Sequence, residues 1–272
     1  MKKTSWYSKA YMSVALGFLY LPILVLIVFS FNESKSRGVF TGFTLDWYVK
    51  LFHNEMILSA LFNTLVIAAI ASVVATVIGT LAAIGINGMK KWAKSLVMNV
   101  TYLPIINPEI VTGVSMLLLF VFIRDKFNVD MELGFFTLLL AHITFCTPYV
   151  ILNVLPKLRQ MDKHTFEAAQ DLGCSPAQAI WKVVIPEIMP GIMAGFLMAF
   201  TYSIDDFIIS YFVSGPTSQT LPIAIYSMTR RKVSPQINAL STIIFVVVLL
   251  VLLGSNIVEA RREKRLNRKE ED

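Results

Sequence analysis

Six long apolar runs constrain this chain more than any other feature of its sequence, because each can cross a hydrocarbon core about 30 Å thick. In lipid every backbone polar group must be paired within the protein, so runs of this length fold as helices. Only 15% of the residues are charged and 56% are hydrophobic, a composition that excludes a soluble globular domain. The sequence predicts an all-α, polytopic membrane protein in which residues 1–272 form one domain. The predicted transmembrane helices cover approximately 10–31, 58–86, 95–123, 134–156, 191–213 and 238–258.

The distribution of Lys and Arg sets the predicted orientation. Most of these residues lie in four segments that fall on one side of the membrane, namely 1–9, 87–94, 157–190 and 259–272. Cytoplasmic loops carry the excess of Lys and Arg, so both termini are predicted to be cytoplasmic, although an RRK cluster at 230–232 opposes this bias. The first run is longer than the apolar core of a signal peptide and ends in FSFNES rather than in small residues, so it is expected to be a retained helix, with a cleaved signal as the alternative. The net charge of +6 is confined to loops and does not indicate nucleic-acid binding.

Three carboxylates lie within predicted spans, where each charge costs about 2.5 kcal/mol or more. Asp205 and Asp206 stand side by side in AFTYSIDDFIISYF of the fifth span, and Glu109 lies near the middle of the third, in YLPIINPEIVTG. Pro104 and Pro108 remove backbone donors beside Glu109 and favour a kink or an unwound turn. The three acids predict an electronegative pathway for a cationic solute. The residues leave open the alternative that these acids are protonated, or pair with basic groups of a partner and serve assembly.

The two aspartates cannot share one helix face, because consecutive helix residues point about 100° apart. Asp206 falls on a polar stripe with Ser203 and Ser210, whereas Asp205 lies one turn from Thr201. One stripe is expected to line the pathway and the other to pack against neighbouring polar groups. The sequence does not assign the two roles.

Other residues of the spans have simpler explanations. His142 and Cys146 lie one turn apart, and such a pair on an apolar face is more often packed and hydrogen-bonded than metal-bound, so no metal site is predicted. Tyr149 and Tyr202 could contact ammonium groups, but tyrosines near span ends more often form the interfacial belt and are not included in the pathway. A stripe of small residues in the second span predicts an ordinary helix contact, at Ala71, Ala75, Gly79 and Ala83. No nucleophile–base arrangement appears, so catalysis is not expected.

The segment 161–190, MDKHTFEAAQDLGCSPAQAIWKVVIPEIMP, carries the signals of two short helices on the cytoplasmic face. Asp162 or Thr165 can cap the first helix, and Gly173 offers the left-handed conformation that ends it. Ser175 and Gln178 form a capping-box pair at the start of the second helix. That helix is expected to stop before the proline at 186, and the fifth span to open at the proline at 190.

EAAQDLG, followed by IWKVVIPEIMPGI, resembles the cytoplasmic EAA signature of permease subunits in binding-protein-dependent ABC importers. The resemblance implies the type I ABC importer permease fold, also called MetI-like. It further implies that Glu167, Ala168, Ala169 and Gly173 dock into a cleft of a separate ATPase subunit and carry its movement to the membrane helices.

The resemblance covers most of the chain and narrows to the spermidine/putrescine branch of this family. The similar stretches are FTLDWYVKLF, AHITFCTPYV, SIDDFIISYFVSGPTSQTLPIAIYSM and VSPQINALSTI. It implies a subunit of an ATP-driven polyamine importer of the bacterial cytoplasmic (inner) membrane, forming half of the translocation pathway. The implied partners are two ATPase copies, a homologous second permease and an extracytoplasmic polyamine-binding protein.

The chain has no G-x-x-x-x-G-K-[ST] sequence, so ATP is expected to be used by partner subunits and no cofactor is predicted on this chain. Three alternatives stay open. The same kind of permease could carry another solute, such as an amino-acid derivative or an iron chelate. The chain could instead be an ion-driven secondary transporter, or a membrane-embedded enzyme.

Overall fold

The computed structural model describes residues 6–34, 39–128, 131–231, 235–247, 249–250 and 253. These residues are almost entirely helical, and the ranges contain no β-strand, only one isolated bridge between Asn32 and Phe43. The prediction of an all-α protein is therefore confirmed for the described part of the chain. The chain forms two compact units, one of Met1–Glu55 with Ile225–Asp272 and the other of Met56–Ala224.

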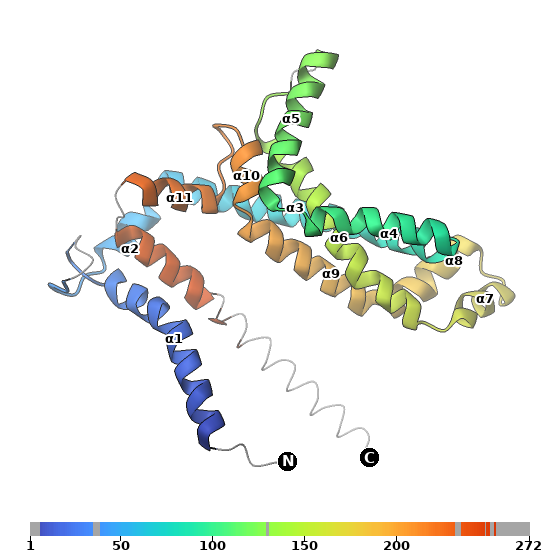
Figure 1. Ribbon diagram of the computed structural model, residues 1–272, viewed down its shortest axis with the longest axis horizontal. Helices are drawn as coiled ribbons and strands as arrows, with labels where there is room; N and C mark the ends of the chain where they lie inside the picture. The colour runs from blue at the N-terminus through green and yellow to red at the C-terminus, as the bar shows by residue number, and fades with distance from the viewer. Residues whose placement is uncertain are drawn as a thin grey trace. The chain divides into compact units, whose positions relative to one another are not determined.

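The second unit holds the helices that matter most for function (Figure 1). They are α3 (Glu55–Gly88), α4 (Lys91–Ile106), α5 (Glu109–Phe127), α6 (Phe135–Gln160), α7 (Lys163–Asp171), α8 (Pro176–Ala179), the π-helical turn η1 (Ile180–Val184), α9 (Ile185–Asp205) and α10 (Ile208–Val213). Helix α11 (Leu221–Arg231) begins in this unit, which ends at Ala224, and its remaining residues belong to the first unit. Within this unit α6 packs along α9, α4 lies against α6, and α10 packs against α5.

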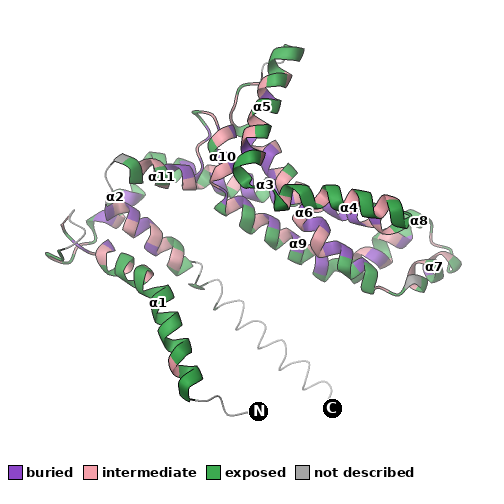
Figure 2. Cartoon of the chain, viewed as in Figure 1, coloured by how far each residue is buried: buried purple, intermediate pink, exposed green. Residues whose placement is uncertain are grey.

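The first unit contains α1 (Trp6–Ser30), α2 (Asp46–Phe52) and a helix over Pro235–Val247. Figure 2 shows that α1 is exposed along nearly its whole length. Many of its apolar side chains are exposed, such as Phe18 at 83%. An apolar helix of this kind is stable where lipid or another subunit surrounds it.

Four helices among the described residues are long and apolar enough to cross a membrane: Trp6–Ser30, Glu55–Gly88, Phe135–Gln160 and Pro176–Asp205. The pair α4 and α5 counts as a fifth if it forms one broken span. The predicted sixth span, 238–258, begins in the helix Pro235–Val247, and its end lies outside the described residues. So do the RRK cluster's last residue and the basic segment 259–272.

The third predicted span, 95–123, is not one straight helix. It divides into α4 and α5, which meet at an angle of 103° after Ile106. Asn107 and Pro108 both adopt extended backbone at this break. Pro108 cannot donate a backbone hydrogen bond, and the residue before a proline is driven out of the helical region. The predicted kink is confirmed, and it is sharp enough to place Glu109 at the start of a new helix rather than in mid-span.

The fifth predicted span, 191–213, also differs from the structure. The second hairpin helix does not stop before Pro186, because a continuous helix runs from Pro176 to Asp205. The π-helical turn Ile180–Val184 lies just ahead of Pro186, and such wider turns accommodate interruptions of the hydrogen-bond ladder. At the other end the helix stops at Asp205, Asp206 is extended, and α10 follows as a separate short helix. The assumption that both aspartates belong to one helix was therefore wrong.

The core of the second unit is built where α3, α6 and α9 meet. Its buried residues include Ala75, Val150 and Ile188. The small-residue stripe of α3 is buried, and a Cβ at Gly79 would lie 2.7 Å from Cβ of Val150 on α6. The predicted close helix contact is confirmed. In lipid such packing, rather than exclusion of water, holds helices together.

Candidate functional site

The three predicted acids meet at one pocket of about 310 Å³, although they come from two separate breaks in the helices. Glu109 enters it from the break between α4 and α5, and Asp205 and Asp206 enter it from the break between α9 and α10. Helix α6 supplies a third wall through Phe145 and Tyr149. The polar lining thus lies where two helices are interrupted, which membranes tolerate when the exposed backbone is buried in protein or lines a wet cavity.

Glu109 and Asp205 are the two accessible acids of this pocket. Both residues are exposed, and no hydrogen bond or ion pair engages either carboxylate among the residues that the structure describes. Carboxylates that face a cavity without protein partners can accept hydrogen bonds from an ammonium group. The pair provides two acceptors on opposite elements of the same pocket.

Asp206 differs from Asp205, because its side chain is buried and fully engaged. One oxygen, Oδ1, accepts the backbone N–H of Ile209 at 3.3 Å. The other, Oδ2, accepts both the backbone N–H of Ser210 at 2.7 Å and the Ser210 hydroxyl at 2.6 Å. Asp206 therefore caps the first turn of α10, as aspartate does at helix starts.

His142 of α6 joins the same polar cluster. Its Nε2 lies 3.0 Å from Oγ of Ser210 and 3.6 Å from Oδ2 of Asp206, and its Nδ1 lies 2.7 Å from Oγ of Ser203. His142 is fully buried, as is Cys146, whose Sγ donates to the carbonyl of Ala199 at 3.4 Å. The expectation that these two residues are packed and hydrogen-bonded is confirmed. The described residues contain no group of three or more possible metal ligands.

Two tyrosines that the sequence reasoning left out also line the pocket. Tyr149 and Tyr202 stack with ring centroids 4.3 Å apart, beside Glu109 and Asp205. The faces of such rings attract cations. Their sequence signal was ambiguous, because tyrosine is equally typical of the membrane interface.

The EAA residues lie elsewhere in the second unit, on α7 and the turn that follows it. Glu167 is exposed, with its carboxylate 3.3 Å from Nδ1 of the equally exposed His164. Ala168 is exposed and Ala169 is buried, so the small residues leave the outer face of α7 open while its inner face packs. Phe166 anchors α7 against the core shared by α3, α6 and α9. A force applied to α7 would therefore reach these membrane helices through direct contacts.

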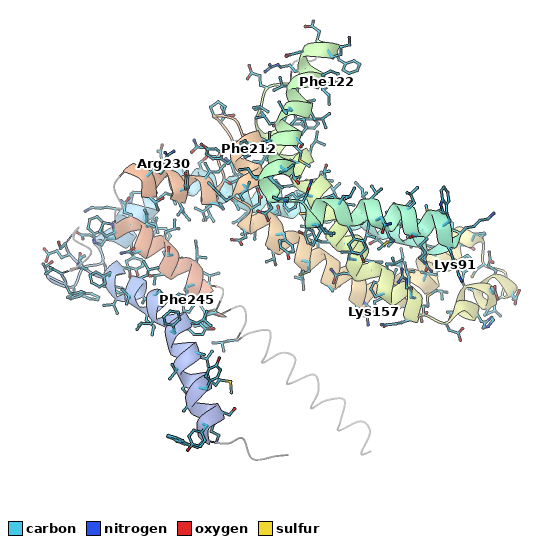
Figure 3. All side chains as sticks on the ribbon, in the orientation of Figure 1. Lys91, Phe122, Lys157, Phe212, Arg230 and Phe245 are labelled. Atoms are coloured by element: carbon cyan, nitrogen blue, oxygen red, sulfur yellow. The ribbon has the colours of Figure 1, made fainter. Side chains whose placement is uncertain are left out.

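The hairpin's predicted caps and its glycine turn are confirmed, although its second helix continues through Pro186. Asp162 accepts a hydrogen bond from the backbone N–H of His164, and the Ser175–Gln178 capping box is formed. Gly173 has a φ of +88°, a conformation that L-residues with a side chain rarely adopt. Figure 3 shows Lys91 and Lys157 at the end of the second unit that carries α7 and α8. Two large apolar side chains near the hairpin, Leu172 and Trp181, are 87% and 69% exposed, a feature that no sequence pattern had indicated.

This combination of an exposed, anchored hairpin and a polar pocket between broken helices agrees with a comparison against known families. The profile of the family described as "Binding-protein-dependent transport system inner membrane component" matches residues 75–268. The chain belongs to this family. As a binding-protein-dependent permease it is a component of a transport system of the inner membrane.

Curated relatives of this permease match nearly its whole length. The spermidine/putrescine transport system permease protein PotC of Escherichia coli (strain K12) is 37% identical over 254 residues, covering 93% of this chain and 94% of the relative. The putrescine transport system permease protein PotI of the same organism is 40% identical over 250 residues, covering 91% and 89%. PotC of Haemophilus influenzae is 36% identical over 249 residues, covering 92% and 95%.

Solved structures share the permease's fold. A bacterial ABC transporter involved in the import of the acidic polysaccharide alginate contains a chain with a TM-score of 0.73, 18% identity and 94% coverage of both chains. The alginate transporter in complex with an alginate pentasaccharide-bound periplasmic protein gives a TM-score of 0.70, with 19% identity and 90% coverage of both chains. The predicted type I ABC importer permease fold is confirmed.

Proposed function

We propose that this permease is one of two membrane-spanning subunits of an ATP-driven polyamine importer. The observation that carries the proposal is the pocket in which Glu109, Asp205 and Asp206 converge. Polyamines such as spermidine and putrescine are flexible chains with several ammonium groups, and each ammonium can donate hydrogen bonds to a carboxylate. The names of the relatives at 36–40% identity support the same cargo.

The pocket suits transient rather than permanent binding. Its two accessible carboxylates and its pair of stacked tyrosines offer charge and ring faces to an ammonium group, and the methylenes of a polyamine can lie against the aromatic walls. A conducting path must bind its cargo weakly enough to release it. A second permease chain would supply the other half of the pathway.

The energy of ATP hydrolysis would reach the permease through α7. On this proposal two ATPase subunits bind and hydrolyse ATP, so that this chain carries no cofactor, and one of them receives the EAA residues Glu167, Ala168, Ala169 and Gly173. Phe166 would pass the closure of the ATPases to α6 and α9, which both line the pocket. The hairpin and both termini would face the cytoplasm, and an extracytoplasmic binding protein would deliver polyamine to the opposite side.

A panel of cargoes tests this function. The chain is reconstituted with its partner permease, ATPase and binding protein, and cargo-stimulated ATP hydrolysis is measured with putrescine, spermidine, an amino acid and an iron chelate. We expect stimulation by the polyamines alone. Stimulation by the amino acid or the chelate, without a response to either polyamine, would assign a different cargo to the same scaffold.

A further inference from the structure

The polar cluster beside the pocket contains a chain of hydrogen bonds whose direction can be worked out. Asp206 Oδ2 accepts the hydroxyl proton of Ser210, so the Ser210 oxygen must accept its remaining bond, which comes from Nε2 of His142 at 3.0 Å. Nε2 therefore carries a proton. In neutral imidazole Nδ1 is then the acceptor, and the Ser203 hydroxyl at 2.7 Å donates to it. The chain runs from Ser203 through His142 and Ser210 to Asp206.

This chain of hydrogen bonds connects three helices at the point where the fifth predicted span is interrupted. Ser203 lies on the last turn of α9, Ser210 lies on α10, and His142 comes from α6. All three are fully or almost fully buried. Hydrogen bonds in such a dry site are strong, and leaving one member unpaired is costly.

The position of both accessible acids depends on this junction. Asp205 is the last residue of α9, directly before the break. Glu109 is the first residue of α5, and α5 packs on α10 so closely that a Cβ at Gly113 would lie 2.9 Å from Phe212 and 3.3 Å from Cα of Ile209. Figure 3 shows Phe212 beside α5. A shift of α10 would therefore move Glu109 as well as Asp205.

We propose that Asp206 and His142 are positioning residues: the hydrogen-bond chain Ser203–His142–Ser210–Asp206 fixes the α9–α10 break and so places Asp205 and Glu109, the two acids that contact the cargo. The proposal deepens the proposed function and rests on it for the cargo. It also separates the two neighbouring aspartates. Asp205 presents its carboxylate to the pocket, whereas both oxygens of Asp206 are occupied by donors of α10.

The test compares the two aspartates in the complete transporter, by measuring KM and the maximal rate of spermidine uptake. Asp206→Asn replaces one of the two accepting oxygens with an NH₂ group, so that either the N–H of Ile209 or the two donors of Ser210 lose their acceptor. We expect a loss of about tenfold in maximal rate, the equivalent of one disrupted buried hydrogen bond. The increase in KM should stay smaller than that of Asp205→Asn, because both carboxylates that contact the cargo are still present. Asp205→Asn and Glu109→Gln should instead raise KM.

Substitutions of the other members of the hydrogen-bond chain add a second criterion. His142→Leu and Ser210→Ala should reproduce the effect of Asp206→Asn on the maximal rate, and His142→Gln, whose amide can still donate to Ser210, should restore most of it. Thr201→Val is the matched control, because the Thr201 hydroxyl is exposed and bonds only to the carbonyl of Leu197 in its own helix. If His142→Leu does not assemble, Ser210→Ala and His142→Gln still decide the matter.

Two outcomes would overturn the inference. One is an increase in KM for Asp206→Asn as large as that for Asp205→Asn, which would make Asp206 a cargo ligand. The other is wild-type transport by both Asp206→Asn and Ser210→Ala. Failure of the proposed function looks different: the wild-type transporter would take up no spermidine. The same variants would then be compared with the cargo that stimulates the ATPase, and a loss of maximal rate in Asp206→Asn would still support the positioning role.

Discussion

At the scale of single residues, the chemistry of the pocket depends on what surrounds each side chain. Residues that are adjacent in the sequence can have different surroundings and therefore different roles. Asp205 and Asp206 are adjacent, yet one faces a cavity and the other is buried among the hydrogen-bond donors of α10. A carboxylate in the second environment is already satisfied by protein. Only the first is available to a cationic solute.

Tyr202 provides a residue-scale prediction. Its ring stacks on Tyr149 and lines the pocket with Asp205, so replacing it with leucine removes a cation–π face, an interaction of about 1 kcal/mol. We expect Tyr202→Leu to raise KM for spermidine about fivefold. Tyr202→Phe keeps the ring and serves as the control. An equal increase in both variants would assign the effect to the hydroxyl, and no increase in either would remove the ring from the binding site.

At the scale of elements, α7 is a short helix with an open outer face and an anchored inner face. Glu167 lies on the open side, with 70% of its side chain exposed, and Phe166 packs into the core. Such an arrangement suits a helix that receives a partner on one side and moves membrane helices on the other.

Reversing the charge at Glu167 tests this reading of α7. Glu167→Lys should abolish ATP-dependent uptake while the protein still reaches the membrane, because the change alters the docking surface without touching the core. Asp125→Lys, at an exposed acid near the end of α5, is the control and should transport normally. Co-purification of the ATPase with each variant measures docking. Undiminished uptake by Glu167→Lys would contradict the role given to α7.

A second element-scale prediction concerns the packing of α3 on α6. A Cβ at Gly79 would lie 2.7 Å from Cβ of Val150, so Gly79→Ala should destabilise the assembled transporter by about 1–3 kcal/mol, the usual cost of overpacking. Gly85→Ala on the same helix meets nothing within 4 Å and should be neutral. Thermal unfolding in detergent measures both. Adding Val150→Ala to Gly79→Ala should recover stability, and equal melting temperatures for the two single variants would refute the close contact.

At the scale of the whole molecule, the chain has the features of one subunit of a larger assembly. The helix α1 is apolar and exposed along nearly its whole length, and the acids of the pocket come from two helix breaks. Membrane helices with this much uncovered surface are expected to meet lipid and other subunits. The family to which the chain belongs is named for dependence on a binding protein.

This dependence gives a whole-molecule prediction. Liposomes that contain the chain alone should accumulate no polyamine under an imposed ion gradient. Liposomes with the complete set of subunits should accumulate it only when ATP is supplied to the ATPase side. Gradient-driven uptake by the isolated chain would identify a secondary transporter instead.

The sequence alone predicted much of the architecture, because membrane insertion and helix capping depend on residues that are close together in the sequence. Apolar run length predicted the helices, Pro108 predicted the kink, Gly173 and the Ser175–Gln178 pair predicted the hairpin turn, and the EAA motif identified the family. It also singled out the three acids within the predicted spans, because a carboxylate inside a membrane is costly unless it has a use.

Tertiary structure decided the rest. Contacts between residues far apart in sequence decide where the helix continues through Pro186 and where α9 ends at Asp205. They also bring the two helix breaks to one pocket and place His142 in the buried polar cluster beside it. Helical periodicity extends only as far as the helix does, so it could not separate two adjacent aspartates once the helix ended between them. The surrounding packing assigned one to the pocket and the other to the fold.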